Sequence, residues 1–351
     1  MHDGIPELLR QIGDDLPQHR EGCRIGANAM IDLLYEAFAS SQSRALATVA
    51  RELPFRLKLA PSPHISWGNV FGHDVTLAAP SLFAEAMPEI PAGLVRNAVS
   101  AHMFAVIEAF GTDRIEDGQV SVTAELTAVL DALRGARDAA LRRVCPSLME
   151  AQVDFAVMWP KTMAAMAEER ALLQSGRLVS FEVYEATSLG KQSVGFPASL
   201  ALAHAAGWHE SKRENVYEAL ASTWLGLQMH DDTVDWEDDL MRGGAWAVAL
   251  SHAPFADASG VQCCKLDAGI DMAAARTQVH GAGALHRMLA RATHHYENVE
   301  RKALALGARS LAAWATTRAD KLETLTAREA LMPGYATRAH ALHAWAGEVL
   351  P

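Results

Sequence analysis

The sequence predicts an all-α protein, built as one large helical domain over residues 1–351. Alanine and leucine dominate the composition and β-branched residues are sparse, a balance that suits helices. Cues for repeated short strands and for two-residue hairpin turns are missing. Half of the residues are hydrophobic, which is ample for a large core, and neither a low-complexity linker nor an internal repeat divides the chain.

Helical periodicity marks the first segments of the chain, and proline or glycine separates them. Residues 25–50 form the first periodic segment, which ends ahead of Pro54. Residues 80–111 form the second, which ends at Gly111. Between them, 54–78 is expected to be a long irregular connection.

The same periodicity continues through the rest of the chain. The periodic segments follow in the order 118–143, 149–174, 178–190, 198–207, 212–241, 270–307 and 309–329. The breaks between them lie at Cys145, Pro146, Gly195, Pro197, Gly243 and Gly244. We expect 251–269 to be a second irregular connection and the helical core to occupy roughly 80–330.

Charge and cysteine content exclude several classes of protein. The net charge is −11 and the pI is about 5.7, so the chain lacks the basic footprint of proteins that bind nucleic acid by charge. The N-terminus shows no signal-peptide pattern, and no stretch reaches the about 18 apolar residues of a membrane span. The four cysteines show no metal-like or disulfide-like spacing, so we expect a reducing, cytoplasmic location.

Residues 227–239, LQMHDDTVDWEDD, crowd acidic side chains onto one helical segment. Helix positions three or four apart share a face, so the apolar side chains of Leu220 and Trp224 predict an inward position for Asp231. Asp235 follows one turn later. Carboxylates on an inward face are costly unless a cation lies among them, and oxygen ligands favour Mg²⁺ over zinc. The candidate metal ligands here are Asp231, Asp232, Asp235 and Asp239. The alternative is a solvated acidic face.

Lys191 is the only lysine or arginine between Arg177 and Lys212, and it lies in a run of small and apolar residues. A metal site built for a diphosphate needs a point positive charge nearby, a role that suits this lysine. The alternative is a lysine that extends to solvent.

The segment from Gln228 to Asp235, QMHDDTVD, resembles the second aspartate-rich motif of trans-prenyltransferases, in which a glutamine precedes DDxxD by three residues. Lys191, about forty residues upstream, is similar to the lysine that those enzymes use on diphosphate. Asp231, Asp235 and Asp239 also have the i, i+4, i+8 spacing of the second metal motif of class I terpene synthases, which share the fold. That motif has serine, threonine or glycine in the middle, where this chain has aspartate.

The resembled families carry a first aspartate-rich motif roughly a hundred residues before the second. At that distance, Asp113 and Asp117 have the spacing of the first and last acids of DDxxD. Arg114 replaces the second acid, and Glu116 is an additional one. We expect Asp113 and Asp117 to bind metal at the mouth of a helical bundle. The alternative is a solvated loop.

The resemblance covers about residues 80–300 and identifies the chain as a divergent member of the class I isoprenoid synthase superfamily. It implies a single antiparallel helical bundle around a deep apolar cavity. Two acidic motifs face each other across the mouth of that cavity, and roughly two or three Mg²⁺ ions bridge them to a prenyl diphosphate. Homodimers are common in the resembled family.

The resemblance and the chemistry together assign roles to residues. Asp231, Asp235 and Lys191 are the predicted catalytic residues, because they would neutralise the departing diphosphate through metal ions or by direct contact. Aromatic faces can stabilise the carbocation that remains, although each aromatic residue has ordinary core packing as its alternative. The predicted substrate-binding residues are Lys191, Gln228, Arg291, Tyr296, Phe104, Phe110, Phe181, Tyr184 and Trp224, with Arg287 as a further donor.

The choice of reaction depends on whether a second diphosphate has partners. Elongating prenyltransferases hold isopentenyl diphosphate with a GKxxRP-like motif and an arginine pair, and both are missing here. We therefore expect a terpene synthase that ionises one prenyl diphosphate and then cyclises or eliminates. The alternatives are a chain-elongating prenyltransferase and a non-catalytic protein of the same fold that binds a prenyl lipid or assists an active partner. GxGxxG, GxxxxGK[ST] and GxSxG motifs are absent.

Overall fold

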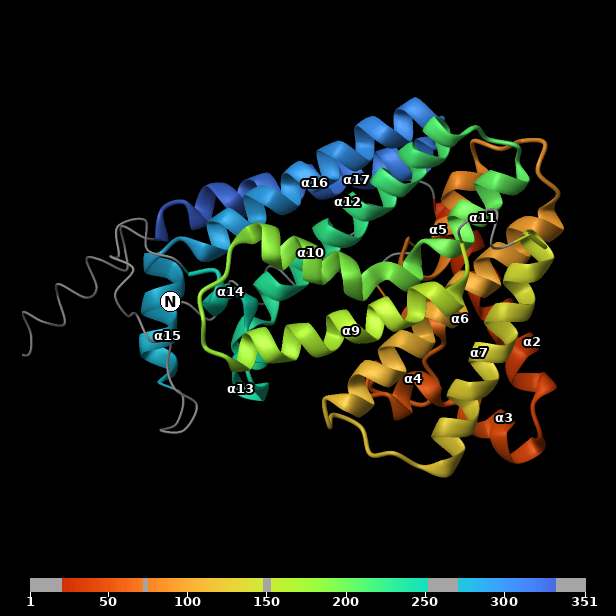
Figure 1. Ribbon diagram of the computed structural model, residues 1–351, viewed down its shortest axis with the longest axis horizontal. Helices are drawn as coiled ribbons and strands as arrows, with labels where there is room; N and C mark the ends of the chain where they lie inside the picture. The colour runs from red at the N-terminus through yellow and green to blue at the C-terminus, as the bar shows by residue number, and fades with distance from the viewer. Residues whose placement is uncertain (1–20, 72–74, 148–152, 252–270, 333–351) are drawn as a thin grey trace, which may run out of the picture.

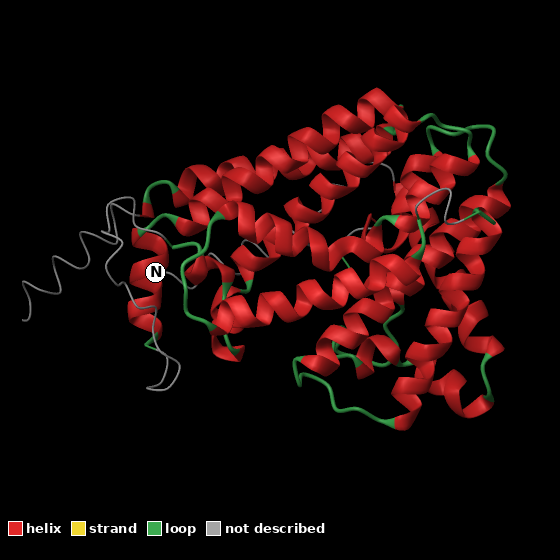
Figure 2. Ribbon diagram, viewed as in Figure 1, coloured by secondary structure: helices red, strands yellow, loops and turns green. Residues whose placement is uncertain are grey.

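The computed structural model describes residues 21–71, 75–147, 153–251 and 271–332. Across these ranges the regular structure is helical and no strand occurs, so the all-α prediction is confirmed (Figures 1 and 2). Of the predicted connection 251–269, only Ser251 lies within the described residues. None of the helices in these ranges combines the length and the apolar character that a membrane crossing requires.

The long helix α6 packs closely against several of the helices that precede residue 150. In chain order they are α2 (Glu21–Ser41), α3 (Arg44–Arg51), α4 (Leu53–Arg56), η1 (Trp67–Asn69), α5 (Val75–Ala84), α6 (Ala92–Glu116) and α7 (Ala124–Val144).

The remaining helices include α12, which carries Asp231 and Asp232 of the acidic segment. In chain order they are α9 (Phe155–Gln174), α10 (Phe181–Lys191), η2 (Gln192–Gly195), α11 (Pro197–Ala205), α12 (Glu210–Val234), α13 (Trp236–Arg242), α14 (Trp246–Ala249), α15 (Met272–Gly281), α16 (Ala284–Leu306) and α17 (Arg309–Glu329).

The predicted irregular connection 54–78 is only partly irregular. Pro54 lies in the first turn of α4, where the missing N–H of proline removes no helical hydrogen bond. The short helix η1 follows, and α5 begins at Val75, ahead of the predicted helix start. The prediction was wrong here because it treated proline as a helix breaker at a position where proline begins a helix.

The predicted segments 25–50, 80–111 and 270–307 each divide into two helices, with breaks at 42–43, 85–91 and 282–283. Other boundaries also differ. Helix α6 passes through Gly111 and ends at Glu116. A Cβ atom at position 111 would lie 2.7 Å from a methyl group of Leu130 on α7. Glycine therefore permits close helix packing at this point. The predicted helix 212–241 divides at Asp235, whose φ of −101° and ψ of 8° leave helical geometry between α12 and α13.

Two clusters of buried apolar side chains stabilise the bundle. The larger includes residues of α12, α16 and α17, which pack closely along one edge of the molecule (Figure 1). Only Gly307 and Ala308 join α16 to α17, so these two helices run antiparallel. The smaller cluster includes residues of α2, α6 and α7. Helix α6 contributes to both clusters, as expected of a helix buried on most of its surface.

A buried ion pair fixes α6 against α7. The Glu108 side chain is fully buried and accepts hydrogen bonds from Arg137 Nη1 at 2.6 Å and Arg134 Nε at 2.7 Å. The Arg137 guanidinium lies over the Phe155 ring at 4.5 Å, which adds α9 to this junction. Removing one partner of a buried pair is costly, so the contact restrains the register of α6.

Candidate functional site

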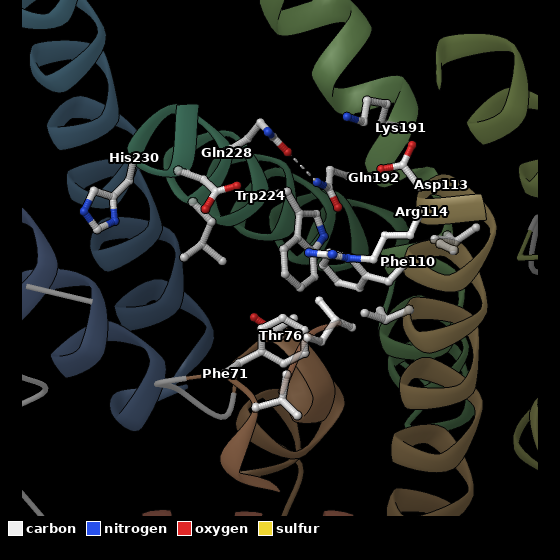
Figure 3. Close-up of a pocket in the computed structure, with 18 of the residues that line it drawn as sticks. Phe71, Thr76, Phe110, Asp113, Arg114, Lys191, Gln192, Trp224, Gln228 and His230 are labelled. Carbon is white, nitrogen blue, oxygen red and sulfur yellow. Dashed lines mark hydrogen bonds between the residues drawn. The ribbon is translucent and has the colours of Figure 1, made fainter. Parts of the chain in front are cut away.

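A cavity of about 740 Å³ lies between α6, η2, α12 and the segment around Val70 and Phe71. Its charged edge carries residues of α6, α10, α12 and α17, and much of the remaining wall is apolar (Figure 3). The volume falls within the range of small-molecule sites. The charged residues that line it are Asp113, Arg114, Lys191, Asp231, Asp235 and Arg318.

Asp231 and Asp235 both line the cavity, as the apolar stripe of α12 predicts. Asp231 lies in the last turn of α12, and its carbonyl oxygen accepts the N–H of Asp235 at 3.0 Å. The Asp231 side chain is open to the cavity, yet the surrounding helices limit its hydration. This partial burial, with the nearby charge of Asp235, raises the pKa of Asp231 to about 6 despite the opposing effect of Lys191 and Arg114.

Asp232 is absent from the cavity lining and instead connects two helices. Tyr184 Oη on α10 donates to Asp232 Oδ2 at 2.6 Å, and Gln228 Nε2 donates to Asp232 Oδ1 at 2.9 Å. Burial raises the pKa of Asp232 well above its usual range. Gln228 accepts in turn from Gln192 Nε2 at 3.1 Å, the bond drawn in Figure 3. The structure therefore places Asp232 and Tyr184 behind the cavity wall, while Gln228 lines it.

Asp239 lies on α13, beyond the break at Asp235. Arg242 Nη1 donates to its Oδ1 at 3.1 Å. Burial raises the pKa of Asp239 to about 7, and the charge of Asp231 adds to this rise. Asp239 is not among the cavity-lining residues, because the kink between α12 and α13 separates it from the straight helix that the i+8 spacing assumes.

Of the acidic residues in segment 113–117, only Asp113 lines the cavity. Asp113 lines it from the last turns of α6, and burial raises the pKa of Asp113 against the opposing charge of Lys191. Asp117 follows the last residue of α6, is exposed, and accepts a hydrogen bond from Arg170 Nη1 at 3.2 Å. Arg170 also pairs with Glu116 at 2.6 Å. Thus Asp113 faces the same cavity as Asp231 and Asp235, and Asp117 does not line it.

Lys191 ends α10 and lines the cavity, as expected, but it already has an anionic partner. Its ammonium donates to Glu169 Oε2, and the other oxygen of Glu169 accepts from Trp246 Nε1 at 2.7 Å. Burial would lower the pKa of Lys191, but Glu169 and Asp113 outweigh it and raise the pKa. The lysine is therefore protonated and held in place.

Trp224 and Phe110 are the predicted aromatic residues that line the cavity. The Trp224 ring stacks on His102 at a centroid distance of 5.8 Å, and His102 Nε2 lies 3.0 Å from the carbonyl oxygen of Thr76. Burial lowers the pKa of His102 to about 4, so this ring is neutral near pH 7. Phe110 packs against Phe71 at 5.3 Å (Figure 3).

The other predicted substrate-binding residues lie elsewhere. Phe104 packs on Phe38 at 5.1 Å in the smaller core. Phe181 lies beneath the Arg291 guanidinium at 4.5 Å, and Arg291 Nη1 donates to Glu185 Oε1 at 2.6 Å. These side chains are absent from the cavity lining because helix phase turns them toward other helices.

Tyr296 and Arg287 on α16 also lie outside the cavity lining. Tyr296 is fully buried against Trp314 at a centroid distance of 5.5 Å, and burial raises the pKa of its hydroxyl to about 12. Arg287 donates to the carbonyl oxygens of Ala282 and Leu250. Neither residue lines the cavity.

Sequence reasoning missed several residues at the site. Arg318 on α17 and His230 on α12 line the cavity, and Glu169 on α9 holds Lys191. Helix α17 carries no recognisable motif. Arg318 reaches the cavity only because α17 packs near α12 through α16, a tertiary contact that local pattern does not encode.

Within the described ranges, no cluster of three or more histidine, cysteine or carboxylate side chains surrounds one point. Protein side chains alone therefore do not complete a metal site there. Asp231 and Asp235 offer carboxylate oxygens one turn apart, and a hard cation can complete its coordination with water and ligand oxygens.

Comparison with known proteins identifies the fold. No family model and no curated protein matches this sequence. The structure matches the crystal structure of polyprenyl synthetase from Streptomyces coelicolor A3(2) with a TM-score of 0.67, over 85% of this chain and 98% of that chain. Sequence identity is 16%. The chain therefore has the isoprenoid synthase fold with a strongly divergent sequence.

Proposed function

We propose that this protein is a Mg²⁺-dependent class I terpene synthase that ionises a prenyl diphosphate and directs the carbocation into cyclisation or elimination. The observation that carries the proposal is that Asp113 on α6 and Asp231 and Asp235 on α12 line one cavity. An acidic edge thus adjoins an apolar compartment. This juxtaposition also favours a catalytic protein over a non-catalytic one of the same fold.

The carboxylates suit Mg²⁺. In proteins this ion commonly uses one or two carboxylates and completes its octahedron with water and substrate phosphate oxygens. Asp231 and Asp235 would supply the carboxylates, with Asp113 opposite them on α6. The raised pKa of Asp231 indicates that its negative charge is poorly compensated in the protein alone. When bound, Mg²⁺ neutralises charge that develops on the departing diphosphate.

The residues of this chain would then position and separate the two products of ionisation. The allylic C–O bond breaks heterolytically, and its electron pair leaves with the diphosphate. Lys191, held by Glu169, and Gln228, held by Gln192 and Asp232, would donate hydrogen bonds to diphosphate oxygens. The faces of Trp224 and Phe110 would stabilise the carbocation, and the apolar wall would exclude water.

Chain elongation is the second candidate reaction. The likeness to a protein described as a polyprenyl synthetase favours it. The missing second-diphosphate motifs favour the one-substrate reaction. The two reactions differ in whether isopentenyl diphosphate is required.

The test is diphosphate release by the purified protein with Mg²⁺. Geranyl, farnesyl, geranylgeranyl and longer diphosphates are offered singly and then with isopentenyl diphosphate, and organic extracts are analysed. We expect release from a single substrate with a hydrocarbon or alcohol product. Release only with isopentenyl diphosphate would replace the proposal by elongation, and no release would favour the non-catalytic alternative.

The matched variants are Asp231→Asn and Asp238→Asn. Asp231 lines the cavity, whereas Asp238 lies exposed on α13 and is outside the cavity lining. We expect Asp231→Asn to lose at least a hundredfold in kcat/KM while Asp238→Asn stays within twofold of the wild type. Unchanged turnover in Asp231→Asn would overturn the site assignment.

A further inference from the structure

Arg114 interrupts the acidic segment of α6 and enters the cavity. It follows Asp113 directly in the last turns of the helix, is half-buried, and lines the cavity. Figure 3 shows its side chain projecting from α6 toward Trp224, while the Asp113 carboxylate points toward Lys191. Adjacent residues on a helix diverge in direction, so one segment presents an acid and a base to different parts of the site.

Unlike Lys191, Arg170 and Arg242, Arg114 has no ion-pair partner among the residues that the structure describes. Lys191 pairs with Glu169, and Arg170 pairs with both Glu116 and Asp117. Arg242 pairs with Asp239. Within the same described ranges, no carboxylate lies within ion-pair distance of the Arg114 guanidinium, and no hydrogen bond engages it.

Charges of both signs surround the Arg114 guanidinium. The carboxylates of Asp113, Asp231 and Asp117 attract it, and the guanidinium of Arg242 repels it. Burial lowers the pKa of Arg114, although arginine remains protonated in proteins. The guanidinium is thus a permanent charge between the two acidic helices, with donors available to a ligand.

The chemistry of a guanidinium defines that ligand. Its N–H groups form a rigid fork that matches two oxygens of a phosphate. Asp117, which would complete a metal site with Asp113, is instead engaged by Arg170. The α6 side of the cavity therefore offers one carboxylate and one available arginine, a poor site for a divalent ion but a good one for a phosphate oxygen.

We infer that Arg114 binds the diphosphate of the substrate directly and replaces one metal ion on the α6 side of the cavity. This inference rests on the proposed function for the identity of the substrate. Metal ions would then be held chiefly from the α12 side, by Asp231 and Asp235. The competing explanation is that Arg114 only offsets the charge of Asp231 in the ligand-free protein.

Calorimetric binding of inorganic pyrophosphate to the full chain in EDTA separates these explanations. We expect the wild type to bind without metal and Arg114→Gln to bind at least tenfold more weakly. Arg114→Lys keeps the charge but loses the fork, so its affinity should lie between the two. Arg170→Gln, which removes a rim cation already paired with Glu116 and Asp117, should stay within twofold of the wild type. Circular dichroism confirms that each variant is folded.

The number of metal ions bound per chain tests separately whether Arg114 replaces a metal ion. Arg114→Asp restores an acid at the second position of the motif, so we expect about one more Mn²⁺ per chain than in the wild type. The count is made by elemental analysis after gel filtration equilibrated with Mn²⁺ and pyrophosphate. An equal count in both proteins would overturn the replacement of a metal ion by Arg114.

The outcomes distinguish this inference from the proposed function. A loss smaller than tenfold in Arg114→Gln, or no metal-free binding by the wild type, would overturn the role of Arg114 even if prenyl diphosphates are turned over. Arg114-dependent pyrophosphate binding without turnover of any prenyl diphosphate would support the anion site and overturn the catalytic proposal.

Discussion

Neighbouring aspartates on α12 have opposite surroundings. Asp231 opens onto the cavity with its charge only partly compensated, whereas Asp232 is buried and accepts hydrogen bonds from Tyr184 and Gln228. A satisfied carboxylate positions helices, and an under-compensated one attracts cations. Which of the two aspartates can act in the site therefore depends on the direction of its side chain from the helix, and not on the residue type.

At this scale, Asp231→Asn should stabilise the metal-free protein at neutral pH. The folded state raises the pKa of Asp231 to about 6, so it binds the proton more tightly than the unfolded chain does. Wild-type stability therefore falls as pH rises from about 4 toward 6, and the asparagine variant lacks this loss. Because Asp231 is exposed to the cavity, solvent screening limits the gain to roughly 1 kcal/mol.

Urea unfolding in EDTA measures this difference. The variant should exceed the wild type above about pH 7, and the two should converge below about pH 4. Asp238→Asn, on the exposed side of α13, is the control for the loss of one carboxylate. A destabilised Asp231→Asn at neutral pH would mean that Asp231 makes favourable contacts in the absence of metal.

The sequence predicted some of these residues and missed others for physical reasons. Asp231, Asp235 and Asp113 could be found because their spacing continues an apolar helix face or repeats a motif. Phe181 and Tyr296 were misplaced because an aromatic side chain suits both a pocket and a core, and only helix phase separates the two. Arg318 was missed because the contact that brings it to the cavity joins helices distant in sequence.

At the scale of elements, the short helix η2 shapes the cavity through Gly195. A Cβ atom at this position would lie 2.8 Å from Nε1 of Trp224 on α12, and both residues line the cavity. The glycine therefore allows the indole to occupy its present position. Contact between η2 and α12 sets the shape of the apolar wall.

Gly195→Ala should displace the Trp224 indole and alter the selection of prenyl chain length. Under the proposed function, we expect about a tenfold fall in the kcat/KM ratio of the longest accepted substrate to the next shorter one, the usual cost of one methylene in a pocket. Gly135→Ala is the control, since a Cβ atom there meets nothing within 4 Å. An unchanged substrate ratio, with unchanged tryptophan fluorescence, would show that Trp224 does not form the wall as proposed.

The ends of helices could be predicted where the helical periodicity stops at the same place as a break in the sequence. The segment 309–329 matches α17 in full, and 178–190 differs from α10 by a few residues. Gly111 misled because a glycine that admits a neighbouring helix looks the same in sequence as one that ends its own helix. The break at Asp235 has no glycine or proline to announce it.

At the scale of the whole molecule, the bundle brings Asp113 and Asp231 to one cavity from helices far apart in sequence. Like charges converge there, so a ligand that carries cations between them should hold the helices together. Anything that binds the folded state alone raises its stability by mass action.

Mg²⁺ and pyrophosphate together should therefore raise the melting temperature more than the sum of their separate effects. A gain of about 2.7 kcal/mol is expected at a ligand concentration a hundredfold above Kd. Differential scanning calorimetry measures the shift with each ligand alone and with both. Removing Mg²⁺ with EDTA should reverse the cooperative part, and Asp231→Asn should abolish it. Strictly additive shifts would contradict a shared site.

The buried contact of Glu108 with Arg134 and Arg137 determines how well the end of α6 tolerates substitution. It anchors α6 one to two turns before Asp113 and Arg114, so the path of the helix does not depend on which residues occupy its last turns. Mutations at the acidic segment can then be sampled with little penalty to folding. Substitutions at position 114, Arg114→Asp among them, should therefore leave the path of α6 unchanged.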